Sequence, residues 1–111
     1  MAHLVFDGTV DLLRAAEALP REVHRWRTAV LKIEDVWRRT DGTALLVEGV
    51  VVEHSRAVHP VAVVAASRDA TSIRLWRNAP VERTDAVQRW LAVIAGELRS
   101  LGNLAFRSTN I

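Results

Sequence analysis

The sequence predicts a single α+β domain in which a strongly curved, cone-like antiparallel sheet packs with two main helices. Three observations lead to this prediction. Residues 43–79 contain three β-type runs joined by two tight connections. Gly49 interrupts one of these runs, and a lone glycine within a strand is typical of a bulge or a sharp bend. After Pro80 the apolar spacing changes from every second residue to every third or fourth, which indicates a helix.

The length and composition fit one globular domain that spans residues 1–111. Half of the residues are hydrophobic and a quarter are charged, as in ordinary globular proteins. The chain has no cysteine, which excludes disulfides and thiolate sites. The first residues lack a basic stretch ahead of an apolar core, and apolar runs such as residues 61–66 are too short to cross a bilayer. We therefore expect a cytoplasmic protein that does not span a membrane.

The charge pattern argues against a nucleic-acid partner. The isoelectric point is about 10.4, although the formal net charge is +2. With no tyrosine or cysteine, nothing titrates between histidine and lysine, so a small excess of arginine raises the isoelectric point strongly. Basic residues also alternate with acidic ones, as in Arg21-Glu22, and form no basic stripe with interleaved aromatic residues.

The N-terminal part is predicted to form a short strand, a turn and a helix. Residues 2–6 are apolar enough for a strand, and Asp7-Gly8 is a turn signal. Thr9 is placed to cap a helix over residues 9–19. This helix ends at the following proline, because the residue before a proline is pushed out of the α region.

The predicted sheet follows. Its strands cover residues 26–39, 43–54, 58–67 and 71–79. β-Branched and aromatic residues favour one long first strand, and Asp41-Gly42 supplies the positive φ of a hairpin turn. The third strand is almost wholly apolar, so we expect it to be central and covered on both faces. The last strand alternates and ends at Pro80.

A second helix is predicted over Asp85–Leu101. Its apolar residues recur every three or four positions and form an amphipathic stripe, which Trp90 and Val93 widen. The stripe consists of Val87, Leu91, Ile94, Leu98 and Leu101. Gly102 is a suitable C-terminal stop. Because an exposed apolar face of this size invites association, we expect the helix to pack on the sheet.

This order of strand, helix and long meander resembles the SnoaL-like branch of the nuclear transport factor 2-like superfamily, which has a cystatin-like fold. The resemblance covers about two-thirds of the chain and rests on FDGTVDLLRAAEALP, LKIEDVWRRTDGTALLVEGVVVE and VAVVAASRDATSIRLWRNA. These segments are similar to the family's glycine-then-helix step, its long hairpin with Gly49 at the bend, and its closing hairpin. Only seven residues precede Gly8. The N-terminal helices of the family are therefore missing, or permuted to the helix after Thr84.

The resemblance implies a cone-shaped pocket. In some members this pocket is the active site of an isomerase, a dehydratase, an epoxide hydrolase or a polyketide cyclase. Several of those enzymes use a tyrosine to donate a hydrogen bond to a developing oxyanion, and this chain has no tyrosine. The ketosteroid-isomerase type also places a carboxylate on the strand that matches residues 59–66, which here reads HPVAVVAA. Both absences count against an inherited mechanism. No cofactor is predicted.

A few polar residues remain as candidates for chemistry. His54 and His59 flank one turn beside Glu53, where they could form a general base with an orienting acid or lie in solvent at a rim. The same residues could supply some metal ligands, but a metal site needs three or four at suitable spacing, and none is predicted. His59 is the best catalytic candidate, because imidazole can move a proton near neutral pH.

The ligand site is predicted on the concave wall of the cone. Alternate residues of one strand share a face, so the third strand would offer a mostly apolar wall. Residues of the last strand would lie beside this wall, and a tryptophan would lie at the mouth of the cone. The predicted ligand-binding residues are His59, Val61, Val63, Trp76, Asn78 and Trp26. Such a wall suits a small hydrophobic molecule fixed by one or two polar contacts.

Two hypotheses about function remain open. The first is a small dimeric, non-catalytic module that binds an apolar ligand or a protein. The second is a cofactor-free isomerase, cyclase or hydrolase that acts by acid–base chemistry on a small polyketide- or steroid-like substrate. A homodimer through the outer face of the sheet is expected, because so few helices cannot cover both faces.

Overall fold

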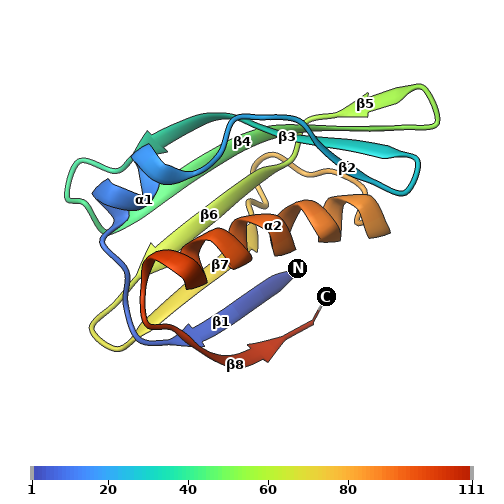
Figure 1. Ribbon diagram of the computed structural model, residues 1–111. Coiled ribbons are helices and arrows are strands. Elements are labelled where there is room, and N and C mark those ends of the chain that lie inside the picture. The colour runs from blue at the N-terminus through green and yellow to red at the C-terminus, as the bar shows by residue number, and fades with distance from the viewer. Residues whose placement is uncertain (1, 111) are drawn as a thin grey trace.

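The structure, a computed structural model that describes residues 2–110, contains eight strands and two helices. In chain order these elements are β1 (His3–Asp7), α1 (Leu12–Ala18), β2 (His24–Trp26), β3 (Ala29–Arg38), β4 (Ala44–Glu53), β5 (Arg56–Val58), β6 (Val61–Ala66), β7 (Ala70–Leu75), α2 (Asp85–Leu101) and β8 (Ala105–Thr109). The strands form one antiparallel sheet in the order β2-β3-β4-β6-β7-β1-β8, and β5 pairs with β4. The sheet curls around α2 into a half-barrel (Figure 1), which confirms the predicted α+β class.

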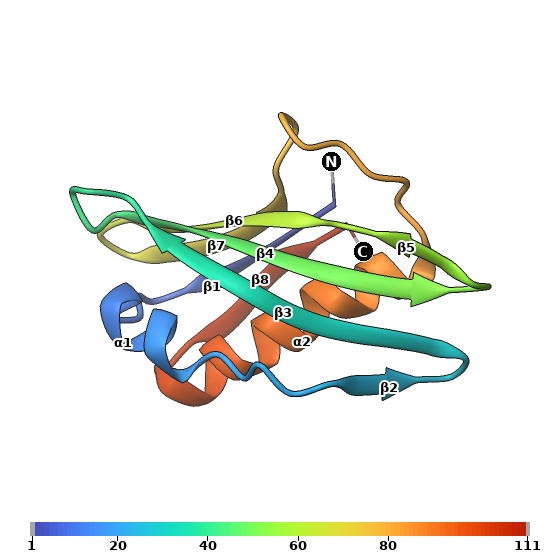
Figure 2. The same ribbon diagram turned by 90° about the horizontal axis from the view of Figure 1, so that it is seen from above.

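Both helices lie on the concave side of the sheet (Figure 2). The predicted stripe of α2 is buried there, since Val87, Leu91, Ile94 and Leu98 are all 0% exposed. The hydroxyl of Thr84 caps this helix by accepting a hydrogen bond from the Val87 N–H. The prediction that the helix packs on the sheet is confirmed. Within residues 2–110, no helix is long and apolar enough to cross a membrane.

Helix α1 is shorter than predicted. It begins at Leu12 because the carboxylate of Asp11, and not Thr9, accepts hydrogen bonds from the N–H groups of Leu13 and Arg14. Both residues are good N-caps, so the sequence leaves the choice open.

The predicted first and third strands are each divided. The chain reverses at Arg27, which has φ 54°, so that Trp26 of β2 pairs with Ala29 of β3 in a tight hairpin. A second reversal at His54 and Ser55, with φ 53° and 61°, folds β5 back onto β4. These residues adopt the left-handed conformation without being glycine, which is uncommon. The reversal at Arg27 was not predicted, whereas the turn that follows His54 was.

Gly49 makes room for a buried side chain. A Cβ at Gly49 would lie 2.4 Å from Nε1 of Trp90 and 2.6 Å from the carbonyl oxygen of Lys32. The same Nε1 donates a hydrogen bond of 3.1 Å to that carbonyl. The register irregularity lies opposite Gly49, between Ile33 and Asp35 of β3. The predicted bend is therefore shared between the two strands.

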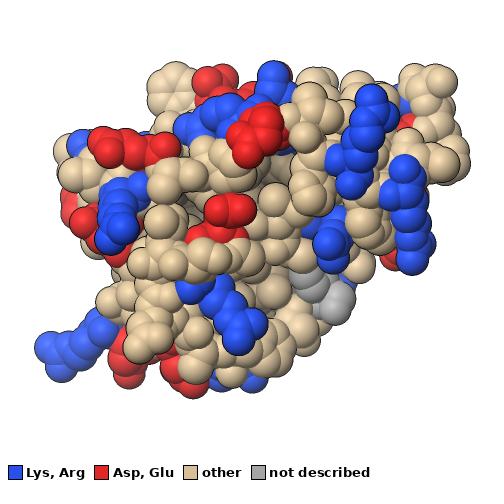
Figure 3. All heavy atoms as spheres, in the orientation of Figure 1, with Lys and Arg blue, Asp and Glu red and all other residues tan. Residues whose placement is uncertain are grey.

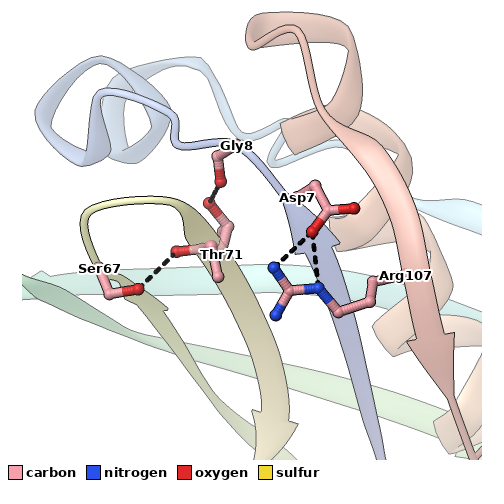
Figure 4. Close-up of polar contacts among 6 residues, drawn as sticks. Asp7, Gly8, Ser67, Thr71 and Arg107 are labelled. Carbon is pink, nitrogen blue, oxygen red and sulfur yellow. Dashed lines mark hydrogen bonds and ion pairs between the residues drawn. The ribbon is translucent and has the colours of Figure 1, made fainter.

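The C-terminal segment after α2, for which no strand was predicted, forms an edge strand along β1 (Figure 4). The carboxylate of Asp7 accepts a hydrogen bond of 2.6 Å from Nε of Arg107 on β8. Beside it, the hydroxyl of the buried Thr71 donates to the carbonyl of Gly8 at 2.9 Å. The contact between Asp7 and Arg107 attaches β8 to the sheet, and the contact between Thr71 and Gly8 joins β7 to the turn after β1.

The convex face of the sheet is also apolar. In β4 the odd-numbered residues Leu45, Val47 and Val51 are buried against the helices, so the even-numbered ones face outward. The apolar residues that the strand pairing places on the outer face include Val5, Val30, Trp37, Ala44, Leu46, Val50, Val52, Val61, Val63 and Ala65. No helix of the described chain covers them (Figure 2).

Candidate functional site

A groove of about 320 Å³ opens between α2 and the sheet edge formed by β2 and β3. Its floor is apolar and consists of Leu31, Ile33, Trp90, Ala92 and Val93. Figure 3 shows the face that carries α2, where acidic and basic atoms lie side by side around a hollow. Small-molecule pockets range from about 300 to 1,000 Å³. The groove therefore has room for a small ligand.

Charged side chains surround this floor. Glu22 and His24 line the groove from the segment before β3, and Arg89 and Glu97 line it from α2. Within residues 2–110, none of these four side chains takes part in an ion pair or a hydrogen bond. They are therefore available to groups on a ligand. Lys32 also borders the groove, but its side chain alternates away from the buried neighbours on either side of it.

The helix presents one side to the groove. Arg89, Val93 and Gly96 follow one another at spacings of four and three residues, which places them along one line of α2. The wall beside them is fixed, because Trp90 is held by its hydrogen bond to the Lys32 carbonyl. At Gly96 a Cβ would meet nothing within 4 Å.

A second hollow, of about 250 Å³, continues the groove toward the N-terminal end of α2. It shares Arg89 and Ala92 with the groove and adds Trp26 and Arg27. The guanidinium of Arg27 lies 4.5 Å from the centre of the Trp26 ring, a cation–π distance. Trp26, predicted at the mouth of a pocket, therefore lies next to the groove.

Val61 and Val63 lie on the convex face, so their predicted place on the concave wall is wrong. Their neighbours Ala62 and Val64, both 0% exposed, take the concave side. Every residue of β6 is apolar, so its pattern could not distinguish the two faces. Val63 instead lines a convex hollow of about 330 Å³ together with Trp37, Leu46, Arg74 and the predicted Trp76.

The remaining predicted residues are not brought together. His59 has a side chain 71% exposed, with Nδ1 at 4.0 Å from a carboxylate oxygen of Glu34. It borders an acidic hollow with Val61, away from the groove. Asn78 is exposed in the segment after β7 and lines none of these hollows. His54, whose side chain is 81% exposed, also lies in solvent.

Neither titration nor metal binding marks a further site in the described chain. The pKa of Asp41 is lowered, first by a hydrogen bond from the Thr43 hydroxyl and then by the Thr43 backbone N–H, but Asp41 lies in the β3–β4 turn, outside the groove. Among residues 2–110, no group of three or more histidine, aspartate or glutamate side chains is placed to hold a metal ion.

The groove residues on α2 were visible in the sequence only as the border of the apolar stripe. Trp90 and Val93 widened that stripe, and Arg89 and Glu97 flanked it. The segment that faces them, around His24, lies more than 60 positions earlier in the chain, and no local pattern connects the two. The chain matches no protein-family model, no curated protein and no solved structure.

Proposed function

We propose that this protein is a small non-catalytic binding domain whose ligand is a small molecule with an apolar body, held in the groove between α2 and the β2–β3 edge. The observation that carries the proposal is the groove itself. It combines an apolar floor of suitable volume with charged side chains that have no partner among residues 2–110. An apolar lining with a few polar groups is typical of small-molecule sites.

Binding without catalysis is supported by the positions of the histidines. A general base must lie within reach of its substrate and is usually oriented by a further group. His59, the best catalytic candidate from the sequence, borders a different hollow. His24 does line the groove, but no carboxylate or carbonyl among residues 2–110 accepts a hydrogen bond from its ring. The acid–base enzyme considered from the sequence would therefore depend on His24.

The groove should bind a hydrophobic fluorescent probe such as anilinonaphthalene sulfonate, and Val93→Glu should weaken that binding at least tenfold. The substitution places a charge on the half-buried floor of the groove, where an apolar ligand would have to cover it. Fluorescence titration measures the affinity. Leu13→Glu is the control, because Leu13 is 51% exposed and lies outside the groove.

Two outcomes would contradict the proposal. The wild type could bind no probe. Alternatively, binding could survive Val93→Glu and disappear in Trp37→Glu, which would place the probe on the convex face. Turnover of an ester, epoxide or steroid substrate that is lost in His24→Gln would favour the enzyme instead.

We also propose that the domain acts as a homodimer through the convex face. Trp37 is 60% exposed there, and exposed tryptophan on an apolar patch is typical of interfaces. Charges of both signs lie on this face. Asp35 and Glu48 lie over β3 and β4, Arg74 lies over β7, and Leu46 and Val63 lie between them. A two-fold axis through this apolar centre would place each acidic pair opposite the partner's Arg74.

Sedimentation equilibrium at micromolar concentration should therefore give twice the monomer mass for the wild type. Trp37→Glu should weaken association about thirtyfold or more, because an aromatic residue at the centre of an interface contributes about 2 kcal/mol or more. Arg74→Glu should weaken it as well, through repulsion from the acidic pair. Leu13→Glu should leave the dimer unchanged. A monomeric wild type would contradict the proposal.

A further inference from the structure

The charged side chains that α2 contributes to the groove differ in sign from one end to the other. Arg89 marks one end, because it also lines the adjoining hollow together with Trp26 and Arg27. His24 belongs to this end, since it lies two residues before Trp26 in β2, although Asp85 also borders the adjoining hollow.

Glu97 marks the other end. It follows Arg89 by eight residues on α2, which at about 1.5 Å per residue separates the two positions by about 12 Å along the helix. The floor between them is apolar. The α2 wall of the groove is therefore basic at one end and acidic at the other, with an apolar floor between, while Glu22 and Lys32 border the groove from the facing segment.

Gly96 lies on the helix between these ends, and nothing in the described fold requires a glycine there. It occupies the interior of a 17-residue helix, where glycine is less stable than alanine. A Cβ at this position would contact no other atom within 4 Å. Gly49 is different, because its Cβ would collide with Trp90. Gly96 is exposed and lines the groove, so a side chain at this position would project into the open groove and not into the core.

We propose that the groove takes an unbranched aliphatic molecule with a carboxylate at one end and an ammonium at the other, and that Gly96 leaves the space in which its chain lies. The carboxylate would meet Arg89 and His24, the ammonium would meet Glu97, and the methylene chain would cover Val93 and Gly96. The inference rests on the proposed binding function and adds the class of ligand and the residue that sets its shape.

Three probes of equal chain length test the charge pattern, namely 8-aminooctanoate, octanoate and octylamine, titrated by calorimetry into the full chain. The amino acid should bind about threefold more tightly than either of the others, since each end adds one exposed ion pair. Arg89→Gln should weaken the amino acid and octanoate and leave octylamine unchanged. Glu97→Gln should weaken the amino acid and octylamine and leave octanoate unchanged.

Two further variants test Gly96. Gly96→Ala should raise the melting temperature by about 4 °C, because the helix gains stability and no contact is disturbed. Gly96→Leu should fold as well as the wild type and bind 8-aminooctanoate at least tenfold more weakly, because the leucine fills the space of the methylene chain. Ser100→Leu is the matched control, since it places the same side chain one turn further along α2, at an exposed position outside the groove.

Unchanged binding of 8-aminooctanoate by a folded Gly96→Leu protein would overturn the role of Gly96. Equal affinity for all three probes would overturn the charge assignment. The proposed binding function would still hold after either result if the hydrophobic probe binds the wild type and Val93→Glu weakens that binding. If the groove binds neither the hydrophobic probe nor 8-aminooctanoate, both the inference and the proposed function are wrong.

Discussion

Replacing Gly49 by alanine is expected to destabilise the domain by about 3 kcal/mol or more. The added methyl group would lie 2.4 Å from the Trp90 ring and 2.6 Å from the Lys32 carbonyl. Neither neighbour can move easily, because the ring is 1% exposed and the carbonyl belongs to the adjacent strand. Overpacking of a close-packed core typically costs about 1–3 kcal/mol, and more where backbone must shift. Urea unfolding measures the loss.

Gly96→Ala is the matched control for this substitution. It adds the same methyl group to another glycine, but into open space, and it should stabilise the protein by about 0.5–1 kcal/mol. A loss below about 0.5 kcal/mol in Gly49→Ala would mean that β4 and α2 can separate without cost, contrary to the packing described above.

Trp90→Ala is expected to cost about 3–5 kcal/mol, the range for removing a large aromatic side chain from a core. Trp90 is 1% exposed and lies between α2, β3 and β4. The loss has two parts, namely the cavity left by the ring and the hydrogen bond to the Lys32 carbonyl. Thermal and urea unfolding of the same variant should agree if unfolding is two-state.

Trp90→Phe separates the two parts, because it keeps most of the ring and removes the N–H. It should cost about 1–3 kcal/mol, since the Lys32 carbonyl then loses its partner. A cost as large as that of alanine would contradict this division. The double variant Gly49→Ala with Trp90→Ala should be less destabilised than the sum of the single changes, because the two positions share one contact.

The contact between Gly49 and Trp90 also links stability to the groove. The ring that Gly49 admits is part of the groove floor. A substitution at Trp90 would therefore alter both folding and ligand binding, and it cannot by itself show where a ligand lies. Val93 and Gly96 are better sites for that question, because both lie outside the buried core.

Local sequence patterns determined the second helix and the general form of the sheet. The stripe on Asp85–Leu101 repeats over several turns, and such long periodic segments depend little on their surroundings. The hairpin turn at Asp41-Gly42 was also predictable, since Gly42 adopts φ 76° as such a turn needs. The reversal at Arg27 was not, because no glycine marks it and tertiary pairing of the strands imposes its conformation. The turn after His54 was predicted, but the left-handed conformation of His54 and Ser55 was not.

The tertiary structure alone decided which face of the sheet is inside and where the groove lies. Strand alternation separates residues into two sets but does not say which set the helices cover, and β6 is apolar on both. The predicted wall of Val61 and Val63 therefore came to lie on the convex face. The groove depends on the approach of His24 to Arg89, which are distant in the chain. Only the packing of α2 into the curled sheet brings them together, because side chains far apart in sequence become neighbours through burial of the apolar stripe.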